Sequence, residues 1–277
     1  MRITDALNLA TQLAEISDSP RLDIEIILCK VLEKPSSYLM TWPDKVLNAE
    51  QQDRFQHYFE RRMSGEPLAY ILGSRGFWTF ELDVSPFTLI PRSDTEVLVE
   101  VALDTLDNSH YRVVDLGTGT GAIALALASE RPNWDVWGCD RISEAVSLAR
   151  RNQSKLGIDN VHFVQGDWFS PLDGRFNLIV SNPPYIDPED SHLQQGDVRF
   201  EPKSALVAED HGLADIKHIL VKATEFLAHE GWLMFEHGYD QAEDVRLLLV
   251  THGYDRVRTY PDYAGNDRVT VGCWRSS

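Results

Sequence analysis

The feature that most constrains the fold is a regular alternation of strand-like and helix-like segments from about residue 112 onward. Short apolar, β-branched runs alternate with longer runs of helical periodicity, which predicts a parallel sheet covered by helices on both faces. Residues 255–260 and 268–274 predict two further strands at an antiparallel edge. We therefore expect an α/β fold with a seven-stranded, mostly parallel sheet. The parallel strands are expected at 112–116, 135–139, 161–165, 176–181 and 231–236, and helices at 122–129, 144–156, 215–228 and 241–252.

The residues before this region follow a different pattern. Residues 1–72 contain several helical stretches separated by short proline-containing breaks, which predicts a small N-terminal helical bundle. In the stretch over residues 21–33, we expect Leu22, Ile26 and Ile27 on the buried side. This part of the sequence contains no pattern of chemically active residues.

A linker is expected between the two parts. Residues 73–92 contain aromatic and β-favouring residues followed by a Ser-Pro turn signal, which predicts a β-hairpin or an extended linker. Residues 93–277 then form the main domain. Its first helix is expected to take Ser93 or Asp94 as the N-terminal cap, because the side chains of both residue types accept hydrogen bonds from free backbone N–H groups.

The net charge restricts the classes of function. The chain has 26 lysines and arginines against 43 aspartates and glutamates, which gives a net charge of −17. An acidic chain repels phosphate backbones, so sequence-independent nucleic-acid binding is disfavoured. The pairs Arg61-Arg62 and Arg150-Arg151 are isolated, and we expect them on solvated helix faces. We expect no direct nucleic-acid partner.

Other residue patterns argue against metal and membrane proteins. The three cysteines lie far apart without CxxC spacing, and the nine histidines form no HExxH or other metal-ligand spacing, so no metal is expected. His237 is expected to be structural. No apolar run approaches the roughly 20 residues that a membrane span needs, and the amino end lacks the apolar core of a signal peptide. These patterns indicate a cytoplasmic protein with no membrane partner.

A glycine-rich loop follows the first predicted strand of the sheet. Residues 117–121 read Gly117-Thr118-Gly119-Thr120-Gly121 and lead into a predicted helix. Glycines allow a tight turn and let the backbone approach a ligand closely. The spacing differs from the Gly-x-Gly-x-x-Gly pattern of dinucleotide-binding proteins, which disfavours an NAD-linked oxidoreductase. Taken alone, the loop is consistent either with a nucleoside-type cofactor or with a tight turn.

The ends of the next two strands carry further candidate ligand-binding residues. Asp140 ends the second strand, where a carboxylate can accept hydrogen bonds from both ribose hydroxyls. Asp167 and Trp168 follow the third strand and offer an acceptor and an aromatic plane for a base. Alternative roles are a helix cap for Asp140, a turn cap for Asp167 and core packing for Trp168. Because ligands of open α/β sheets bind at the carboxyl ends of strands, we expect these side chains to lie close together.

The most informative stretch is Asn182-Pro183-Pro184-Tyr185, which directly follows an apolar strand. The prolines make the turn rigid and remove two N–H donors. The Asn182 side-chain oxygen and the Pro183 carbonyl can then accept both hydrogens of a planar –NH2 group, and Tyr185 offers a flat surface. Such acceptors orient the delocalised, weakly nucleophilic nitrogen of a carboxamide and stabilise the charge that forms on it. A proline-rich turn with no catalytic role is the alternative.

With these motifs, the sequence resembles class I S-adenosylmethionine-dependent methyltransferases, and more closely the HemK/PrmC family of release factor glutamine methyltransferases. The resemblance covers essentially the whole chain. It implies a seven-stranded Rossmann-like methyltransferase sheet preceded by a helical domain and a hairpin. The motifs that carry it are Ile90-Pro91-Arg92, Asp115-Leu116 with the glycine loop, Asn182-Pro183-Pro184-Tyr185-Ile186 and Arg199-Phe200-Glu201-Pro202.

The resemblance implies methylation of the side-chain amide of the glutamine in the Gly-Gly-Gln motif of class I peptide-chain release factors. S-adenosyl-L-methionine is the implied methyl donor. The implied donor-binding residues are Gly117, Thr118, Gly119, Thr120, Gly121, Asp140, Asp167, Trp168 and Asn182, and the implied glutamine-binding residues are Asn182, Pro183, Pro184 and Tyr185. Arg92 and Glu201 are expected either to line the substrate pocket or to form a structural salt bridge.

Two other methyltransferase functions fit the same turn. An adenine-N6 methyltransferase also acts on a nitrogen whose lone pair is delocalised and weakly nucleophilic. Such an enzyme has to hold nucleic acid, however, which the net charge disfavours. A glutamine methyltransferase of a ribosomal protein is not distinguished by these motifs. Only the helical domain over residues 1–72, which the resemblance implies is a docking surface for the substrate, favours release factors. A non-catalytic binding module is disfavoured because the glycine loop and Asn182 are both intact.

Overall fold

The computed structural model describes residues 1–275, which divide into two compact units. The first unit comprises Met1–Ser74 and Ser191–Phe200, and the second comprises Arg75–Asp190 and the described residues from Glu201 onward. The chain therefore leaves the second unit shortly after the Asn-Pro-Pro-Tyr turn and returns to it at Glu201. Within residues 1–275, no helix has both the length and the apolar character that crossing a bilayer requires.

The first unit is a small helical bundle built around one apolar core. The core includes Ile24, Ile27 and Leu28 of one helix and Phe55 and Phe59 of another. Its elements are α1 (Ile3–Leu7), η1 (Asn8–Leu13), α2 (Pro20–Leu32), α3 (Ser36–Thr41), α4 (Ala49–Met63), α5 (Leu68–Leu72), η3 (Ser191–Gln194) and η4 (Val198–Phe200).

One face of α2 differs from the sequence expectation. Ile27 is buried as expected, but Leu22 and Ile26 are exposed. The buried row instead runs through Ile24 and Leu28, which are four residues apart and so lie on one side of the helix. Because apolar residues occur on several sides of this helix, the sequence alone did not indicate which side packs inward.

A buried ion cluster links the segment Ser191–Phe200 to the helices of the first unit. The Arg62 Nε donates to Asp23 Oδ2 at 2.7 Å, and Arg62 Nη1 donates to Asp197 Oδ1 at 3.0 Å. Only 5% of the Arg62 side chain is exposed. The expectation that Arg61-Arg62 lies on a solvated helix face was therefore wrong for Arg62, since its partners come from residues 39 and 135 positions away.

The second unit begins with a hairpin of β1 (Ser74–Phe77) and β2 (Phe80–Asp83). The 3-10 turn η2 (Ser93–Thr95) then precedes α6 (Glu96–Thr105). The prediction that Ser93 or Asp94 caps this helix was wrong, because Thr95 occupies the N-cap position and makes no side-chain capping bond. The extra 3-10 turn, which sequence periodicity does not reveal, moves the helix start by two residues.

The main sheet has seven strands in the order β5-β4-β3-β6-β7-β9-β8. Neighbouring strands from β5 to β7 pair in parallel, as expected for the α/β fold. At the other edge, β9 pairs antiparallel with both β7 and β8, which is also as expected. The strands are β3 (Arg112–Leu116), β4 (Asp135–Asp140), β5 (Val161–Gln165), β6 (Phe176–Ser181), β7 (Leu227–Glu236), β8 (Tyr254–Pro261) and β9 (Asp267–Trp274).

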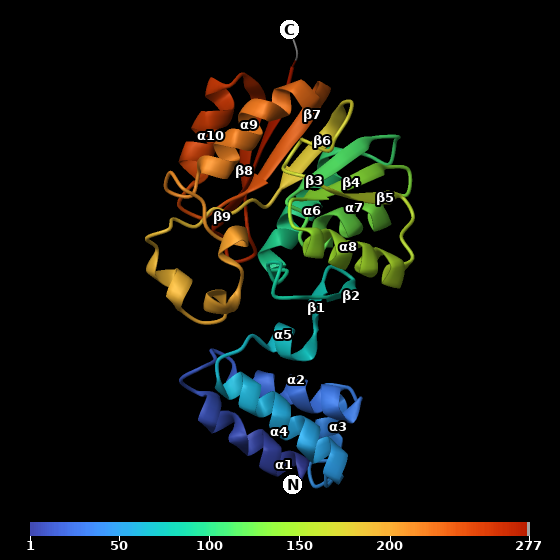
Figure 1. The fold of residues 1–277 in the computed structure, drawn as a ribbon, viewed down its shortest axis with the longest axis vertical. Helices are drawn as coiled ribbons and strands as arrows, with labels where there is room; N and C mark the ends of the chain where they lie inside the picture. The colour runs from blue at the N-terminus through green and yellow to red at the C-terminus, as the bar shows by residue number, and fades with distance from the viewer. Residues whose placement is uncertain (276–277) are drawn as a thin grey trace. The chain divides into compact units, whose positions relative to one another are not determined.

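Helices cover both faces of this sheet (Figure 1). One core lies between the sheet and α6, α7 (Ala122–Glu130) and α8 (Ser143–Leu156). The other lies against α9 (Ala214–Phe226) and α10 (Ala242–Thr251). The expected helix at 215–228 was too long by two residues, because Leu227 already pairs with Phe176 as part of β7.

The strand order creates a switch point beside β3. The chain runs outward from β3 to β4 and β5, and then returns to add β6 on the other side of β3. The helix α7 after β3 and the helix α9 after β6 cover opposite faces, so the connections diverge at the carboxyl ends of these two strands. Ligand sites of open α/β sheets lie at such points. The glycine loop and the Asn-Pro-Pro-Tyr turn both begin there.

We expect Gly138→Ala to destabilise the second unit by about 1–3 kcal/mol, since an added methyl group overpacks a filled core. A Cβ on Gly138 would lie 2.5 Å from the Phe163 ring and 2.9 Å from Thr118 Oγ1. Gly76→Ala is the control, because a Cβ there meets no atom within 4 Å. Urea unfolding followed by tryptophan fluorescence measures both. Equal midpoints for the two variants would contradict this account of β4 packing.

Candidate active site

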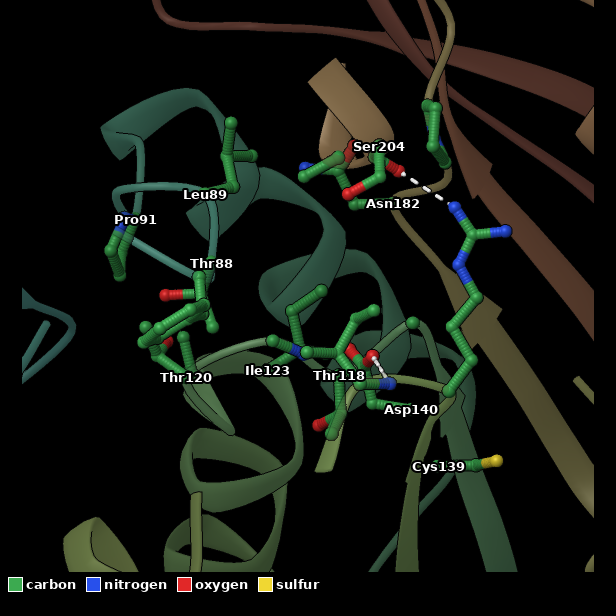
Figure 2. Close-up of a pocket in the computed structure, with 18 of the residues that line it drawn as sticks. Thr88, Leu89, Pro91, Thr118, Thr120, Ile123, Cys139, Asp140, Asn182 and Ser204 are labelled. Carbon is green, nitrogen blue, oxygen red and sulfur yellow. Dashed lines mark hydrogen bonds between the residues drawn. The ribbon is translucent and has the colours of Figure 1, made fainter. Parts of the chain in front are cut away.

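A cavity of about 960 Å³, including the solvent at its mouth, lies at the carboxyl ends of the parallel strands. Figure 2 shows Thr118, Asp140 and Asn182, which follow or end three different strands, around this cavity together with Thr88 and Leu89. The predicted site residues that line it are Gly117, Thr118, Gly119, Thr120, Asp140, Asp167, Trp168, Asn182 and Pro184, whereas Gly121, Pro183 and Tyr185 lie outside its lining.

The glycine loop depends on conformations that side chains disfavour. Gly117, Gly119 and Gly121 have φ values of 74°, 54° and 83°. The N–H groups of Gly117 and Thr118 both donate to the Cys139 carbonyl, at 2.9 and 3.0 Å, which holds the loop against the end of β4. Gly121 serves packing, because a Cβ there would lie 2.9 Å from the Phe163 ring.

Asp140 is held by the backbone and still has acceptor capacity. Its Oδ2 accepts from Gly119 N–H at 3.0 Å (Figure 2). Its Oδ1 accepts from Ile142 N–H at 2.9 Å. Each carboxylate oxygen has about two acceptor sites, so each oxygen keeps one site for a ligand hydroxyl. Burial raises the pKa of Asp140. Asp140 therefore combines the loop-stabilising role with a geometry that suits a ribose.

Asp167 and Trp168 lie at the end of β5. The turn after β5 is closed by Asp167 N–H donating to Ser170 Oγ at 2.9 Å, while the Asp167 carboxylate accepts no hydrogen bond within residues 1–275. Trp168 has a φ of 46° and lines the cavity, and it also packs against the apolar cluster on the α9 side of the sheet. Trp168 therefore packs against the core and also faces the cavity.

Within the Asn-Pro-Pro-Tyr turn, two acceptor atoms are left without donors from residues 1–275. Asn182 Nδ2 donates to Thr95 Oγ1 at 3.2 Å. No N–H or O–H group of residues 1–275 donates to Asn182 Oδ1 or to the Pro183 carbonyl oxygen. Tyr185 points its hydroxyl to Glu236 Oε1 at 3.4 Å, and burial raises its pKa. Tyr185 is thus held by the core behind the turn.

Two buried carboxyl groups support the two loops. Asp115 Oδ2 accepts from the Thr118 hydroxyl at 2.6 Å beneath the glycine loop, and burial raises the pKa of Asp115 to about 7. Glu236 lies behind Tyr185, and burial raises its pKa to about 7 as well. The sequence does contain a signal for Glu236, because it is an acidic residue at the end of a predicted parallel strand.

Several lining residues were not found from the sequence. Thr88 and Leu89 precede the sheet and belong to no motif, and Asp215 begins α9 far beyond the Asn-Pro-Pro-Tyr turn. The further lining residues that sequence reasoning missed are Phe77, Phe87, Thr95, Ala122, Ile123, Cys139, Arg141, Ile142, Gly166, Ser204 and Ala205. Only the three-dimensional convergence of these segments identifies them.

The charged residues around the cavity form a defined pattern. Arg92 lines the cavity and forms an ion pair with the buried Glu201, which also accepts from Ile90 N–H at 2.9 Å. Arg141 donates to the Ser204 carbonyl at 3.4 Å. Three aspartates, Asp140, Asp167 and Asp215, line the same space. The cavity therefore favours a ligand that carries positive charge.

His237 lies outside the cavity lining and is held by hydrogen bonds. His237 is buried, with Nε2 2.7 Å from Thr270 Oγ1 and Nδ1 2.8 Å from the Gly238 carbonyl, and burial lowers its pKa. Within the described part of the chain, no group of three or more histidine, cysteine, aspartate or glutamate side chains is arranged to hold a metal ion.

Two family models match the chain. The model of the PrmC N-terminal domain matches residues 5–73, and a model of a methyltransferase domain matches residues 107–253. Among solved structures, a methyltransferase from Pyrococcus furiosus covers 70% of this chain and 90% of its own, with a TM-score of 0.52 and 19% identity. The hMettl16 catalytic domain covers 70% and 74%, with a TM-score of 0.54 and 17% identity. At these identities, the structures support the methyltransferase fold alone.

Curated relatives match over nearly the full length. The release factor glutamine methyltransferase of Aliivibrio fischeri is 55% identical over 262 residues, which are 94% of this chain and 92% of the relative. The release factor glutamine methyltransferase of Vibrio cholerae serotype O1 is 56% identical over 99% of this chain and 97% of its own. Together with the matching family models and the methyltransferase sheet, these relatives show that the chain is a methyltransferase that belongs to the release factor glutamine methyltransferase family.

Proposed function

We propose that this protein transfers a methyl group from S-adenosylmethionine to the side-chain amide nitrogen of the glutamine in the Gly-Gly-Gln motif of class I peptide-chain release factors. The observation that carries the proposal is the position of Asn182. Its side chain lines the same cavity as the glycine loop and Asp140, and its Oδ1 accepts no hydrogen bond within residues 1–275. An acceptor for an –NH2 group and a nucleoside-type binding loop therefore share one space.

The donor site fits S-adenosylmethionine in charge and in hydrogen-bonding capacity. The free acceptor sites of Asp140 suit two ribose hydroxyls, and the loop from Gly117 to Thr120 lets the backbone approach the ligand closely. Trp168 offers an aromatic surface on the cavity wall. Asp167 and Asp215 place negative charge where a ligand with a sulfonium and an ammonium group gains favourable electrostatics. S-adenosylmethionine, when bound, supplies an electrophilic methyl group.

The Asn-Pro-Pro-Tyr turn is suited to hold and activate the glutamine amide. Asn182 Oδ1 and the Pro183 carbonyl each accept one amide hydrogen, which fixes the plane of the –NH2 group. These acceptors would stabilise the positive charge that develops as the nitrogen bonds to the methyl carbon and the bond from that carbon to the donor's sulfur breaks, which leaves a neutral thioether. A proton then leaves the nitrogen to water. Pro183 and Pro184 keep the acceptors in place, because proline restricts the backbone of the turn.

The names of the relatives favour a release factor as the protein substrate. A ribosomal protein is a second candidate of the same chemistry, while the net charge of −17 disfavours an adenine in nucleic acid. We further propose residues 1–72 as the docking domain, residues 73–92 as the linker and residues 93–277 as the catalytic domain. A protein that modifies release factors is expected to act in the cytoplasm.

A direct test supplies labelled S-adenosylmethionine together with an intact release factor, a ribosomal protein or a plasmid. We expect label on the release factor alone, at the glutamine amide of Gly-Gly-Gln, as mapped by mass spectrometry. Release factor with that glutamine changed to alanine is the control and should stay unlabelled. A short Gly-Gly-Gln peptide should react with a higher KM than the intact factor if residues 1–72 dock it. Label on the plasmid or the ribosomal protein alone would overturn the proposal.

We expect Asn182→Ala to lower kcat for the release factor by about 100-fold or more, the effect typical of losing one preorganised polar group. The dissociation constant for S-adenosylmethionine, measured by calorimetry, should change far less. Asn133→Ala is the matched control, because Asn133 is exposed and lies outside the cavity lining. Turnover by Asn182→Ala close to that of the control would show that the turn does not hold the amide.

We expect Asp140→Ala to weaken S-adenosylmethionine binding by roughly 10- to 100-fold, because hydrogen bonds to a charged group are lost. The exposed Asp159 provides the control variant, Asp159→Ala, with the same change in net charge. Calorimetric titration of each variant with the donor measures the difference. Unchanged donor affinity in Asp140→Ala would assign Asp140 to loop structure alone.

A further inference from the structure

A fully buried asparagine connects two walls of the cavity. Asn152 lies in α8 and is 0% exposed. Its Nδ2 donates to the Thr120 carbonyl of the glycine loop at 2.9 Å and to the Asp83 carbonyl at 3.1 Å. Its Oδ1 accepts from Asp83 N–H at 2.8 Å. A side-chain amide has two hydrogens to donate, and both are used here, so these three bonds fix the orientation of the side chain.

The backbone that Asn152 holds at Asp83 leads directly into a wall of the cavity. Asp83 ends β2 and is followed by the last part of the linker. A Cβ built on Gly119 would lie 3.8 Å from Thr88 Cβ, so this part of the linker lies against the glycine loop. Four of its residues line the cavity, namely Phe87, Thr88, Leu89 and Pro91. The linker is therefore a wall of the cavity as well as a connection.

Buried side chains anchor this wall at both of its ends. Asn152 holds it at Asp83. At the other end, Ile90 N–H donates to Glu201 Oε2 at 2.9 Å, and the Glu201 side chain is 0% exposed. Fixing both ends of so short a stretch limits the conformations of the side chains between them.

The helix α8 also contacts Asp83 from the outside. Lys155 Nζ lies 2.6 Å from Asp83 Oδ1, and 42% of the Lys155 side chain is exposed. Such an exposed ion pair contributes little, and it holds the Asp83 side chain alone. Asn152, in contrast, bonds the backbone of the linker and the backbone of the glycine loop at once.

We propose that Asn152 is a positioning residue for the methyl donor, because it fixes the linker wall against the glycine loop before the donor binds. The inference rests on the proposed function of the cavity and assigns a part in donor binding to residues 84–91. Asn152 lies outside the cavity lining, so it acts through its two backbone partners. Without Asn152, the wall has to be ordered when the donor binds, which costs conformational entropy and lowers the affinity.

The first test compares Asn152→Ala with Asn160→Ala in the full-length protein. Asn160 is the matched control, because its Nδ2 also donates to backbone carbonyls, those of Ala128, Arg131 and Trp134, at 3.1 Å each. Asn160 directly precedes β5, so it lies at the opposite edge of the sheet from the cavity. We expect the Kd for S-adenosylmethionine, measured by calorimetry, to rise about 5- to 20-fold in Asn152→Ala, the effect of losing one or two hydrogen bonds. In Asn160→Ala it should change little.

Kinetic measurements on the same variants separate positioning from general damage. With S-adenosylmethionine at saturating concentration, kcat and KM for the release factor should stay near wild type in Asn152→Ala, because the bound donor orders the wall. The melting temperature should fall in both variants, since each loses several hydrogen bonds. Equal donor affinities in the two variants, or a lowered kcat of Asn152→Ala at saturating donor, would overturn the inference.

A second test uses the wild-type protein alone. Hydrogen–deuterium exchange is followed by mass spectrometry with and without S-adenosylmethionine. We expect the donor to slow exchange over residues 84–91 and over the glycine loop, and to leave residues 156–161 unchanged. Unchanged exchange over residues 84–91 would overturn the inference, even if Asn152→Ala does not fold. Wild type that binds no S-adenosylmethionine would instead refute the proposed function.

Discussion

The pairing of β3 with β6 is the constraint on which the rest of the site depends. The parallel register sets Leu116 beside Ser181, and the Ser181 hydroxyl donates to the Leu116 carbonyl at 2.7 Å. The very next residues are Gly117 and Asn182. Two motifs that are 65 positions apart in the sequence are therefore brought together by backbone hydrogen bonds and one buried side-chain bond. Because helices leave these strands toward opposite faces, the space between the two loops stays open.

The charged residues around the cavity determine which ligands it favours. Three aspartates line the cavity, and Glu201 neutralises one of its two arginines. Behind the lining, Asp115 and Glu236 are buried, and burial raises the pKa of each to about 7. Asp115 contacts the glycine loop through Thr118, and Glu236 contacts the Asn-Pro-Pro-Tyr turn through Tyr185. The cationic donor and uncharged amide of the proposed function suit this distribution better than a phosphate-bearing substrate does.

Rigidity of the two loops comes from different sources. The glycine loop relies on left-handed backbone conformations and on hydrogen bonds to the Cys139 carbonyl and Asp140. The Asn-Pro-Pro-Tyr turn relies on its prolines and on anchoring of Tyr185, whose hydroxyl donates to Glu236 and whose carbonyl accepts from Gln241 at 2.9 Å. The turn therefore presents acceptors without needing donors of its own. In the proposed function, these acceptors take the two hydrogens of the substrate amide.

The sequence by itself determined the α/β class, the order of strands and helices, and the two motifs, because strand periodicity, glycines and prolines act locally. It also indicated Asp140, since a carboxylate at a strand end has a known place in such sheets. Tertiary structure alone decided that Thr88, Thr95 and Asp215 join the cavity and that Arg62 is buried with Asp197. It also decided that Glu236 lies behind Asn182 and that Thr95, not Ser93 or Asp94, occupies the cap position of α6. These features depend on contacts between residues distant in the chain, and no local pattern encodes which distant residues will meet.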